Sequence, residues 1–400
     1  MLLDLVIALC LGVFIGIFTG LAPGVHVNLV SVLVVSFAPI LLQFTSPLTL
    51  GVFIISLAIT HTFLDTLPSI YLGAPDEGMV LNVLPGHRFL LRGEGHSAVI
   101  YTIIGSFGSL ILSLILFPIF IVAMIYLQPF IGTSIGYILI AIMIYMIARE
   151  KKWLAALVAF LLSGCLGLIV FSIPTLRQPL LPLLSGLFGI SLLLTSLAQK
   201  STIPKQKTEV PVHISPAIAA KSVSAATGMG FIAAFLPGFG SSQAAIIATN
   251  IVGDIKEEGF LSLVGGINTA NVAISIAAAY ALDKARNGAI VAVKELLGQV
   301  TLEQMMTFVA VALIAGGMAT ILTLLLSRVF AKMIVKVDYP KLIIGIIIFV
   351  TVLTIYFDGW LGLTILATAT AIGLLTSSWG VGKNHLMGCL LLPVILYFIL

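Results

Sequence analysis

Apolar segments of membrane-spanning length recur from one end of this chain to the other, and they constrain its fold more than any other feature. A helix needs roughly 20 apolar residues to cross the hydrocarbon core of a bilayer. We expect spanning or half-spanning helices over residues 3–21, 25–44, 47–66, 97–117, 119–148 (one helix or two), 153–173, 179–198, 222–252, 268–282, 302–327, 341–357, 359–377 and 384–400. The sequence therefore predicts an all-α polytopic membrane protein with about 10–12 transmembrane or half-spanning helices.

The composition excludes a water-soluble globule. Hydrophobic residues make up 60% of the 400 residues and charged residues only 8%, too little polar surface to cover a soluble protein of this size. The net charge of +4 is small, and no basic stripe interleaves with aromatic residues, which argues against a nucleic-acid partner. The surroundings that this composition predicts are a lipid bilayer.

The first apolar segment has the length of a signal peptide but not its pattern. It begins with the acidic Asp4 instead of Lys or Arg, and it leads into the pair Pro23 and Gly24 instead of a cleavage site. We therefore expect it to be retained as the first helix.

Basic residues predict the orientation of the chain. They gather in three clusters, which we expect to face the cytoplasm: Arg149, Lys151 and Lys152; Lys200, Lys205, Lys207 and Lys221; and Arg328, Lys332, Lys336 and Lys341. A proline-bearing stretch without an apolar run, residues 201–217, is the expected loop linker between two membrane halves, 1–200 and 218–400. The acidic N-terminal end favours inverted halves over parallel ones, and the third cluster does not fit that pattern neatly.

Two copies of one motif interrupt the apolar pattern. The first is Gly16-x-x-x-Gly20-x-x-Pro23-Gly24, and the second is Gly230-x-x-x-Ala234-x-x-Pro237-Gly238. Proline cannot donate a backbone hydrogen bond and glycine adopts unusual dihedral angles cheaply, so the pair ends one helix inside the membrane and lets another begin. We expect an otherwise straight span that is broken at this point in each half, as in internally duplicated transporters of two pseudo-symmetric repeats.

A helix that begins inside the membrane points free N–H groups and the positive end of its dipole into a cavity, which suits an anion. The predicted substrate-binding residues are those at and after the breaks, with two asparagines described below: Pro23, Gly24, His26, Asn28, Pro237, Gly238, Gly240, Ser241, Ser242, Gln243, Asn268 and Asn271. The competing interpretation is that each pair only kinks a packed helix, while the glycines let neighbouring helices approach closely.

A polar island follows the third apolar segment. His61 and Asp65 are four residues apart and so share one helix face, and ionisable residues inside a span are functional candidates. The following stretch, rich in Pro and Gly, predicts a re-entrant hairpin with Asp76 and Glu77 at its tip. We expect these four residues to couple Na⁺ or H⁺. The alternatives are a structural His61–Asp65 pair, and a segment that simply ends in water at Asp76 and Glu77.

A second island occupies residues 265–271, where Asn268 and Asn271 place two amides on one helix face. Residues 254–258 and 86–96 are expected to be charge-rich loops. Within the latter, His87, Glu94 and His96 match no strong metal-ligand spacing, so neither a metal site nor a cofactor is predicted.

Enzyme chemistry is not expected. The chain has no His-Glu-x-x-His helix and no Gly-x-Ser-x-Gly turn, and Asp65 is the only clear intramembrane aspartate where an intramembrane aspartyl protease needs two. Cys10, Cys165 and Cys389 lie far apart in apolar runs, so they predict neither a disulfide framework nor a metal site.

The order of the motifs resembles the large permease subunit of the tripartite tricarboxylate transporters, the TctA family. The resemblance runs from the first Pro-Gly motif through Leu72-Gly-Ala-Pro75 and Leu91-Arg-Gly93-Glu94-Gly95-His96-Ser-Ala98 to Pro237-Gly238-Phe-Gly240, Gly265-Gly266 and the element from Asn268 to Asn271. It implies a secondary active carboxylate permease that works with a small membrane subunit and an extracytoplasmic binding protein. It also implies an anion site at Gly24, Gly238 and Gly240. The chain departs from the family pattern in its shorter length, in His26 after the first motif and in the missing acidic residue before Asn268, so the substrate stays open.

The function predicted from the sequence is secondary transport of small organic anions, di- or tricarboxylates, across the cytoplasmic membrane by alternating access between the two halves. A homodimer is a further expectation. One alternative is a polyprenyl-phosphate translocase, which would need a basic residue near the site, and the candidates are His26, His61, Arg88 and Arg92. Another is a membrane scaffold without transport activity, for which duplicated broken helices are hard to explain.

Overall fold

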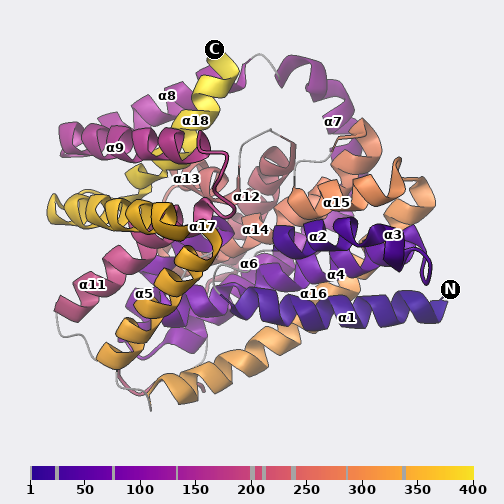
Figure 1. The fold of residues 1–400 in the computed structure, drawn as a ribbon, viewed down its shortest axis with the longest axis horizontal. Coiled ribbons are helices and arrows are strands. Elements are labelled where there is room, and N and C mark those ends of the chain that lie inside the picture. Colours follow the sequence, from indigo (N-terminus) through magenta and orange to yellow (C-terminus); the bar gives the residue numbers. More distant parts are fainter. Residues whose placement is uncertain are drawn as a thin grey trace.

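The computed structural model is a bundle of α-helices (Figure 1). It describes residues 2–22, 27–73, 77–131, 134–198, 203–209, 213–235, 240–284, 287–335 and 339–400, and no strand occurs in these ranges. Eight helices of this described part are long and apolar enough to cross a membrane, and four shorter apolar helices accompany them. The all-α polytopic fold expected from the apolar pattern is confirmed.

The first hairpin unit consists of helices α1 to α4, and its two long helices run in the same direction. The bounds are α1 Leu2–Leu21, α2 Val27–Ser36, α3 Ala38–Leu41 and α4 Pro47–Leu64. Glycines of α1 face α4 in steps of four, Gly12 on Ser56, Gly16 on Thr60 and Gly20 on Leu64. Because α4 therefore begins at the same end as α1, helices α2 and α3 carry the chain back to that end.

The second hairpin unit consists of α12 Pro216–Phe235, α13 Ser241–Val252 and α14 Lys256–Leu282. Its two long helices are also parallel, with Ile218 against Gly259, Ala226 against Gly266 and Gly230 against Ala270. The short helix α13 starts beside Asn271, to which Ser241 is hydrogen-bonded, and ends just before α14 begins. It therefore runs antiparallel to α14.

The chain thus reverses direction at each Pro-Gly motif, so the expectation of a straight span with a break in it is wrong. The motif residues themselves, 23–26 and 236–239, lie outside the described residues. Proline and glycine end a helix because one removes a donor and the other relaxes the backbone, but neither fixes where the next helix points. Helix α2 packs against α15 (Gly288–Leu297) and α4, and α13 packs against α12 and α14.

The two units are interlocked by the next long helix of each half. Helix α6 (Gly95–Ile115) runs parallel to α14, with Tyr101 and Gly105 at Ser262 and Ser109 at Gly266. Helix α16 (Leu302–Ile334) runs parallel to α4, with Phe308 at Gly51 and Gly316 at Ile59.

Helices α6 and α16 are antiparallel to each other, because His96 bonds Ser327 while Leu110 meets Gly316. Since α6 runs with α14 and α16 runs with α4, helices α4 and α14 run in opposite directions.

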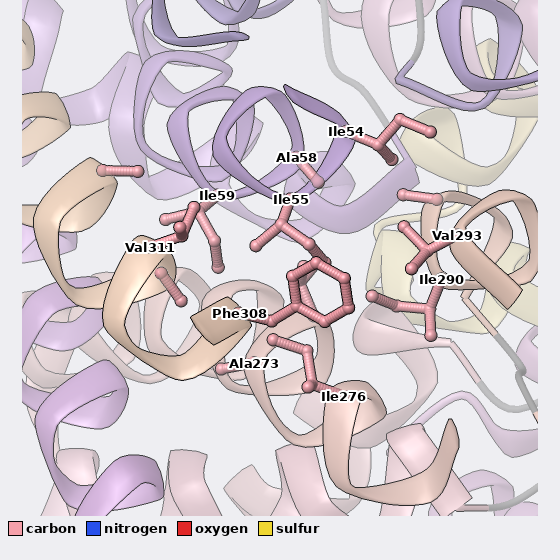
Figure 2. Close-up of a cluster of buried hydrophobic side chains, with 14 of the residues drawn as sticks. Ile54, Ile55, Ala58, Ile59, Ala273, Ile276, Ile290, Val293, Phe308 and Val311 are labelled. Atoms are coloured by element: carbon pink, nitrogen blue, oxygen red, sulfur yellow. The ribbon is translucent and has the colours of Figure 1, made fainter. Parts of the chain in front are cut away.

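A dry core joins the same helices. Figure 2 shows Phe308 of α16 surrounded by Ile55 and Ile59 of α4, by Ile276 of α14 and by Ile290 of α15 (Gly288–Leu297). These side chains are at most 2% exposed, and burying each contributes roughly 1.5–3 kcal/mol. This core, shared by α4 and by helices of the other half, holds the two hairpin units together.

The remaining helices surround this centre. They are η1 Pro68–Leu72, η2 Glu77–Asn82, α5 Val83–Leu91, α7 Phe117–Ile131, α8 Ile135–Ala148, α9 Trp153–Phe171, α10 Leu180–Leu184, η3 Ser185–Ile190, α11 Ser191–Ala198, α17 Tyr339–Ser378, η4 Lys383–Met387 and α18 Gly388–Ile399. The apolar stretch 119–148 forms two helices, and Gly359, with φ of 60° and ψ of −149°, divides α17 into the two expected segments.

Several boundaries differ from the expectation. Lys256 to Glu258 open α14 instead of forming a loop, so this helix begins twelve residues before the expected span at 268. The positive end of the helix dipole stabilises acidic residues in the first turn of a helix. A run of charges can therefore begin a helix as well as form a loop. Residues 83–91 form α5 where a loop was expected. The apolar stretch 222–252 is divided between α12 and α13.

The described residues of the three basic clusters lie on one side of the bundle, where α6 and α14 begin; we call it the basic side. Arg149 lines a cavity with Gly253, and Lys207 N donates to Gly93 O just before α6. Arg328 follows Ser327, which bonds the start of α6. Part of the third cluster lies on α16 instead of in a loop. The third cluster lies on the basic side because α16 ends on the side of the bundle where α14 begins.

Candidate functional site

Buried polar side chains meet where the two hairpin units touch, and we call this group the polar layer. It consists of Thr19 from α1, His61 and Thr62 from α4 with Asp65 directly after it, Ser241 from α13, and Asn268, Thr269 and Asn271 from α14. All are buried except Asn271, which is half-buried. The structure therefore brings the two polar islands of the sequence together.

The contact at the centre of the layer joins Asp65 and Asn268, which are 203 residues apart in the chain. Nδ2 of Asn268 donates to Oδ2 of Asp65 over 2.8 Å. Asp65 is 2% exposed and Asn268 8%. Burying a carboxylate costs several kcal/mol unless hydrogen bonds or a cation compensate it. Such a residue inside the membrane is a strong functional candidate.

Three threonines extend this contact, and the sequence interpretation missed them. Oγ1 of Thr269 donates to Oγ1 of Thr62 over 3.1 Å. Thr19 Oγ1 lies 3.1 Å from Nδ1 of His61 and donates to Gly16 O over 3.2 Å. Thr62 and Thr269 each sit next to a predicted polar residue, and that adjacency is the signal that would have found them. The hydrogen bond from His61 to Thr19 joins α4 to α1.

The N-terminus of α13 opens onto the same layer. Gly240 is the N-cap residue of α13; its backbone is extended, and it has no side chain that could accept from the first N–H groups of the helix. Asn271 Nδ2 donates to Ser241 Oγ over 3.3 Å, and Ser242 is fully buried beside it. Helix α13 therefore directs the positive end of its dipole toward Asn271. The side chain of Gln243 lies outside the described residues.

Other predicted site residues have different places. Asn28, near the start of α2, is exposed and its carboxamide lies against Gly288 at the start of α15. Glu77 opens η2, but its side chain is not among those described. The following predicted residues lie outside the described residues: Pro23, Gly24, His26, Asp76, Pro237 and Gly238.

The charged stretch before α6 is separate from the polar layer. Arg88 and Arg92 both bond Glu257, at 3.2 Å and 2.8 Å. Glu257 precedes Asn268 by eleven residues on α14, a rise of roughly 16 Å. These two arginines therefore belong to the basic side, well away from Asp65.

The three residues considered as metal ligands do not form a site. His96 Nδ1 lies 2.9 Å from Ser327 Oγ, and burial lowers the pKa of His87 to about 4. No group of three or more His, Cys, Asp or Glu side chains in the described ranges is arranged to hold a metal ion.

The linker is held against the first half. Gln206 is buried; its Nε2 donates to Leu90 O over 2.9 Å, and its Oε1 accepts from Gly95 N over 3.0 Å. One carboxamide thus joins the end of α5 to the start of α6. Helix α12 begins at Pro216, so the stretch without helix ends two residues before the expected boundary.

Comparison with known proteins matches this chain to a transporter family over nearly its whole length. The family model described as the tripartite tricarboxylate transporter TctA family matches residues 6–388. An uncharacterised protein of Methanocaldococcus jannaschii, MJ1079, is 30% identical over 401 residues, which cover 98% of each chain. No solved structure matches.

Proposed function

Because the chain belongs to the tripartite tricarboxylate transporter TctA family, we propose that it is a secondary active permease for small organic anions, di- or tricarboxylates, in the cytoplasmic membrane. The family is one of transporters, and the chain is a multi-pass membrane protein. The observation that carries the proposal is the bond between Asp65 and Asn268, which places a buried carboxylate and an amide beside the N-terminus of α13.

The proposal includes two inverted repeats, 1–200 and 218–400, joined by the linker 201–217. Support comes from the helix directions: α1 runs with α4, α12 runs with α14, and α4 opposes α14. Each hairpin unit also packs against the α6 or α16 helix of the other half. Transporters of this kind bind substrate near the membrane midplane, where the repeats meet. Alternating access would then be movement of one unit against the other.

The substrate anion is proposed to lie at the ends of the short helices. At α13 the proposed donors are backbone N–H groups at the start of the helix and the side chains of Ser241, Ser242 and Asn271. A carboxylate at that position is stabilised by the helix dipole and by several hydrogen bonds at once. The motif residues Pro23, Gly24, Pro237 and Gly238, with His26, Asn28, Gly240 and Gln243, complete the proposed site.

Asp65 is proposed to bind the coupling ion. A carboxylate that is 2% exposed repels an anionic substrate held close to it. A Na⁺ or a proton on Asp65 removes that repulsion, so the ion and the anion favour each other's binding. His61, Asp76 and Glu77 are the further residues proposed for coupling. This reciprocal effect is what symport requires.

We further propose that the chain works with the other components of a tripartite system, a small membrane subunit and an extracytoplasmic binding protein, and that it forms a homodimer. The family name supports the first part of this proposal. The lipid-phosphate alternative needs a basic residue near the site. Arg88 and Arg92 are paired with Glu257 on the basic side, whereas His61 lies in the polar layer, where it is hydrogen-bonded to Thr19. His26 lies outside the described residues.

The decisive experiment is uptake of labelled citrate and of a panel of dicarboxylates into proteoliposomes that hold the purified chain, with and without a Na⁺ or H⁺ gradient. Gradient-driven uptake of a carboxylate is the expected result. The same vesicles supplemented with the partner subunits separate a need for partners from a lack of transport. Polyprenyl-phosphate translocation in vesicles that take up no carboxylate under either condition would replace the proposal.

A further inference from the structure

Helix α17 turns sharply at Gly359, and a carboxylate lies on the inner side of this turn. The backbone of Gly359 is not helical, with φ of 60° and ψ of −149°. A Cβ placed on Gly362 would lie 2.6 Å from Cβ of Asp358 and 3.2 Å from the carbonyl oxygen of Thr354. In a straight helix the rise from Thr354 to Gly362 would be roughly 12 Å. We call the group formed by Thr354, Asp358 and Gly362 the α17 corner.

Two buried oxygens of the α17 corner have no hydrogen-bond partner among the described residues. They are Oδ2 of Asp358 and Oγ1 of Thr354. Asp358 is 9% exposed, and Thr354 is fully buried. The other carboxylate oxygen, Oδ1, accepts from the backbone N–H group of Arg177 over 2.6 Å and from that of Gln178 over 3.0 Å. Buried polar atoms are nearly always paired, so the two oxygens indicate a ligand or an ordered water at this corner.

The hydroxyl of Thr354 differs from every other threonine hydroxyl of α17. The others each donate to a backbone carbonyl three or four residues earlier: Thr351, Thr364, Thr368, Thr370 and Thr376. A helical threonine can always turn its hydroxyl back to such a carbonyl. Within the described chain Thr354 makes no bond of this kind, although it is fully buried. Its oxygen therefore keeps its lone pairs for a ligand at the corner.

The carboxylate of Asp358 gives the α17 corner its charge. In the described ranges no Lys, Arg or His side chain lies within ion-pair distance of this carboxylate. One helical segment ends at the corner and another begins, so their dipoles oppose each other, and the carboxylate decides the sign of the local potential. The two backbone N–H groups satisfy Oδ1 without adding a positive charge. A buried carboxylate in this situation attracts a cation.

The α17 corner lies away from the basic side, near the opposite surface of the membrane. The first segment of α17 begins beside Lys341 of the third basic cluster. From Lys341 to Asp358 it rises roughly 26 Å, most of the roughly 30 Å hydrocarbon core. Tyr356 and Trp360 flank the corner and are 77% and 78% exposed, as aromatic residues at a membrane surface are. A cation in the solution on that side can therefore reach the corner without crossing the membrane.

We propose that the α17 corner binds Na⁺ through Oδ2 of Asp358 and Oγ1 of Thr354, with backbone carbonyl oxygens at the end of the first segment as further ligands. Oxygen ligands suit a hard cation, and a single carboxylate suits a single positive charge. The ion has a structural role: the carboxylate that holds it also accepts from Arg177 and Gln178, so it ties the connection between α9 and α10 to α17. The site shares no residue with the polar layer and is independent of the proposed transport function.

The first test measures equilibrium binding of radioactive Na⁺ to the purified chain in detergent. Asp65→Asn serves as the parent, so that an ion at the proposed coupling residue is not counted. The parent should still bind Na⁺, and a further Thr354→Val change, which keeps the shape of the side chain, should raise the Kd for Na⁺ about tenfold. Thr351→Val is the matched control, because the Thr351 hydroxyl bonds Ile347 O, and its Kd should equal that of the parent. A parent that binds no Na⁺ would overturn the proposal.

The second test compares melting temperatures of the same proteins in Na⁺ and in N-methylglucamine at equal ionic strength. Na⁺ at about ten times its Kd should raise the melting temperature of the parent by about 2 °C, and Asp358→Asn should abolish this rise. A rise of equal size in the parent, in Thr354→Val and in Asp358→Asn would mean that Na⁺ acts elsewhere, which would overturn the site. If Asp358→Asn fails to fold, the comparison of Thr354→Val with Thr351→Val decides.

Discussion

The α1–α4 unit and the α12–α14 unit each place a parallel pair of long helices beside a shorter helix that runs back, yet they supply different chemistry to the polar layer. The first unit contributes ionisable groups, His61 and Asp65, whereas the second contributes neutral amides, Asn268 and Asn271. The ion and the anion of a coupled transporter need different ligands. Two units of similar geometry that carry different side chains suit this requirement. Under the proposed function, the first unit binds the coupling ion, and the second unit supplies most of the described donors to the anion.

Asp65→Asn is expected to have the largest effect. The side chain keeps its shape and can still accept from Asn268, but it loses the charge that the coupling ion neutralises. Gradient-driven citrate uptake should fall about a hundredfold, equivalent to losing a strong charged interaction. Thermal stability should not fall, because a buried charge is removed. Uptake in proteoliposomes and a melting curve in detergent measure the two effects.

The control for that variant is Asp358→Asn. Asp358 is also buried, but its Oδ1 accepts from Arg177 N and Gln178 N at one end of the peripheral α17 segments. Its loss should lower the melting temperature while leaving the ion dependence of uptake intact. Retention of normal Na⁺ or H⁺ dependence in Asp65→Asn would break the comparison, since the ionisable unit would then have no coupling role.

Glycine substitutions test whether the two units are built alike. A Cβ at Gly16 would lie 2.7 Å from Thr60 Cβ, and a Cβ at Gly230 would lie 2.5 Å from Ala270 Cβ. Both distances are shorter than real Cβ contacts, so Gly16→Ala and Gly230→Ala should each destabilise by about 1–3 kcal/mol. Gly317→Ala, where nothing lies within 4 Å, should instead be neutral or stabilising. Melting temperatures in one detergent compare all three.

Unequal losses would sharpen that result. A fall confined to Gly16→Ala would mean that only the first unit depends on close helix contact, and the shared geometry would then not be a shared constraint. A fall in Gly317→Ala of the same size as the others would show that the losses at Gly16 and Gly230 do not come from their close helix contacts.

Substitutions of the two asparagines of the second unit should have effects of different size, because the two side chains have different hydrogen-bond partners. Asn268→Ala removes the donor to a carboxylate and should weaken citrate uptake about tenfold. Asn271→Ala removes a longer contact of 3.3 Å to the Ser241 hydroxyl, so a loss of only about threefold is expected if it also donates to the anion. Ion dependence at fixed citrate, and citrate dependence at fixed ion, are the two measurements. An effect of Asn268→Ala on the ion dependence alone would contradict its predicted place among the substrate-binding residues.

Thr269→Val should have the smallest effect. It keeps the volume of the side chain and removes the hydrogen bond to Thr62 that joins the units. The expected cost is about 1 kcal/mol of stability with coupling unchanged. Urea or thermal unfolding of the purified protein measures it, and a loss of ion dependence would place Thr269 among the ion ligands.

Much of this architecture could be predicted from the sequence because each membrane-spanning helix corresponds to a long apolar run. The division of residues 341–377 into two segments follows from Asp358 and Gly359, which interrupt an otherwise continuous run. The polar islands were found for the same reason, since Asp65 and Asn268 stand out against apolar neighbours. The assignment of roles to these residues stays a prediction.

The rest depended on contacts that no local pattern encodes. The bond between Asp65 and Asn268 joins helices from the two halves, and α2 of the first half packs against α15 of the second. Helix α14 includes Lys256 and Glu257 because charged residues at the end of a helix can lie at the membrane surface. Hydropathy does not predict the part of a helix that lies there. The sequence could not predict that Gln206 joins α5 to α6, because its partners are backbone atoms of Leu90 and Gly95.

The anchored linker limits how far the two halves can travel apart. Gln206 and Lys207 are hydrogen-bonded to the end of α5 and the start of α6, and the backbone of His213 is hydrogen-bonded to Tyr101 of α6. Only Ile214 and Ser215 lie between His213 and Pro216, where α12 begins. Three residue steps reach at most about 11 Å when fully extended. The linker is thus a short covalent connection that is held against the first half. Shortening it by a few residues would restrain the second half without changing any side chain of the polar layer.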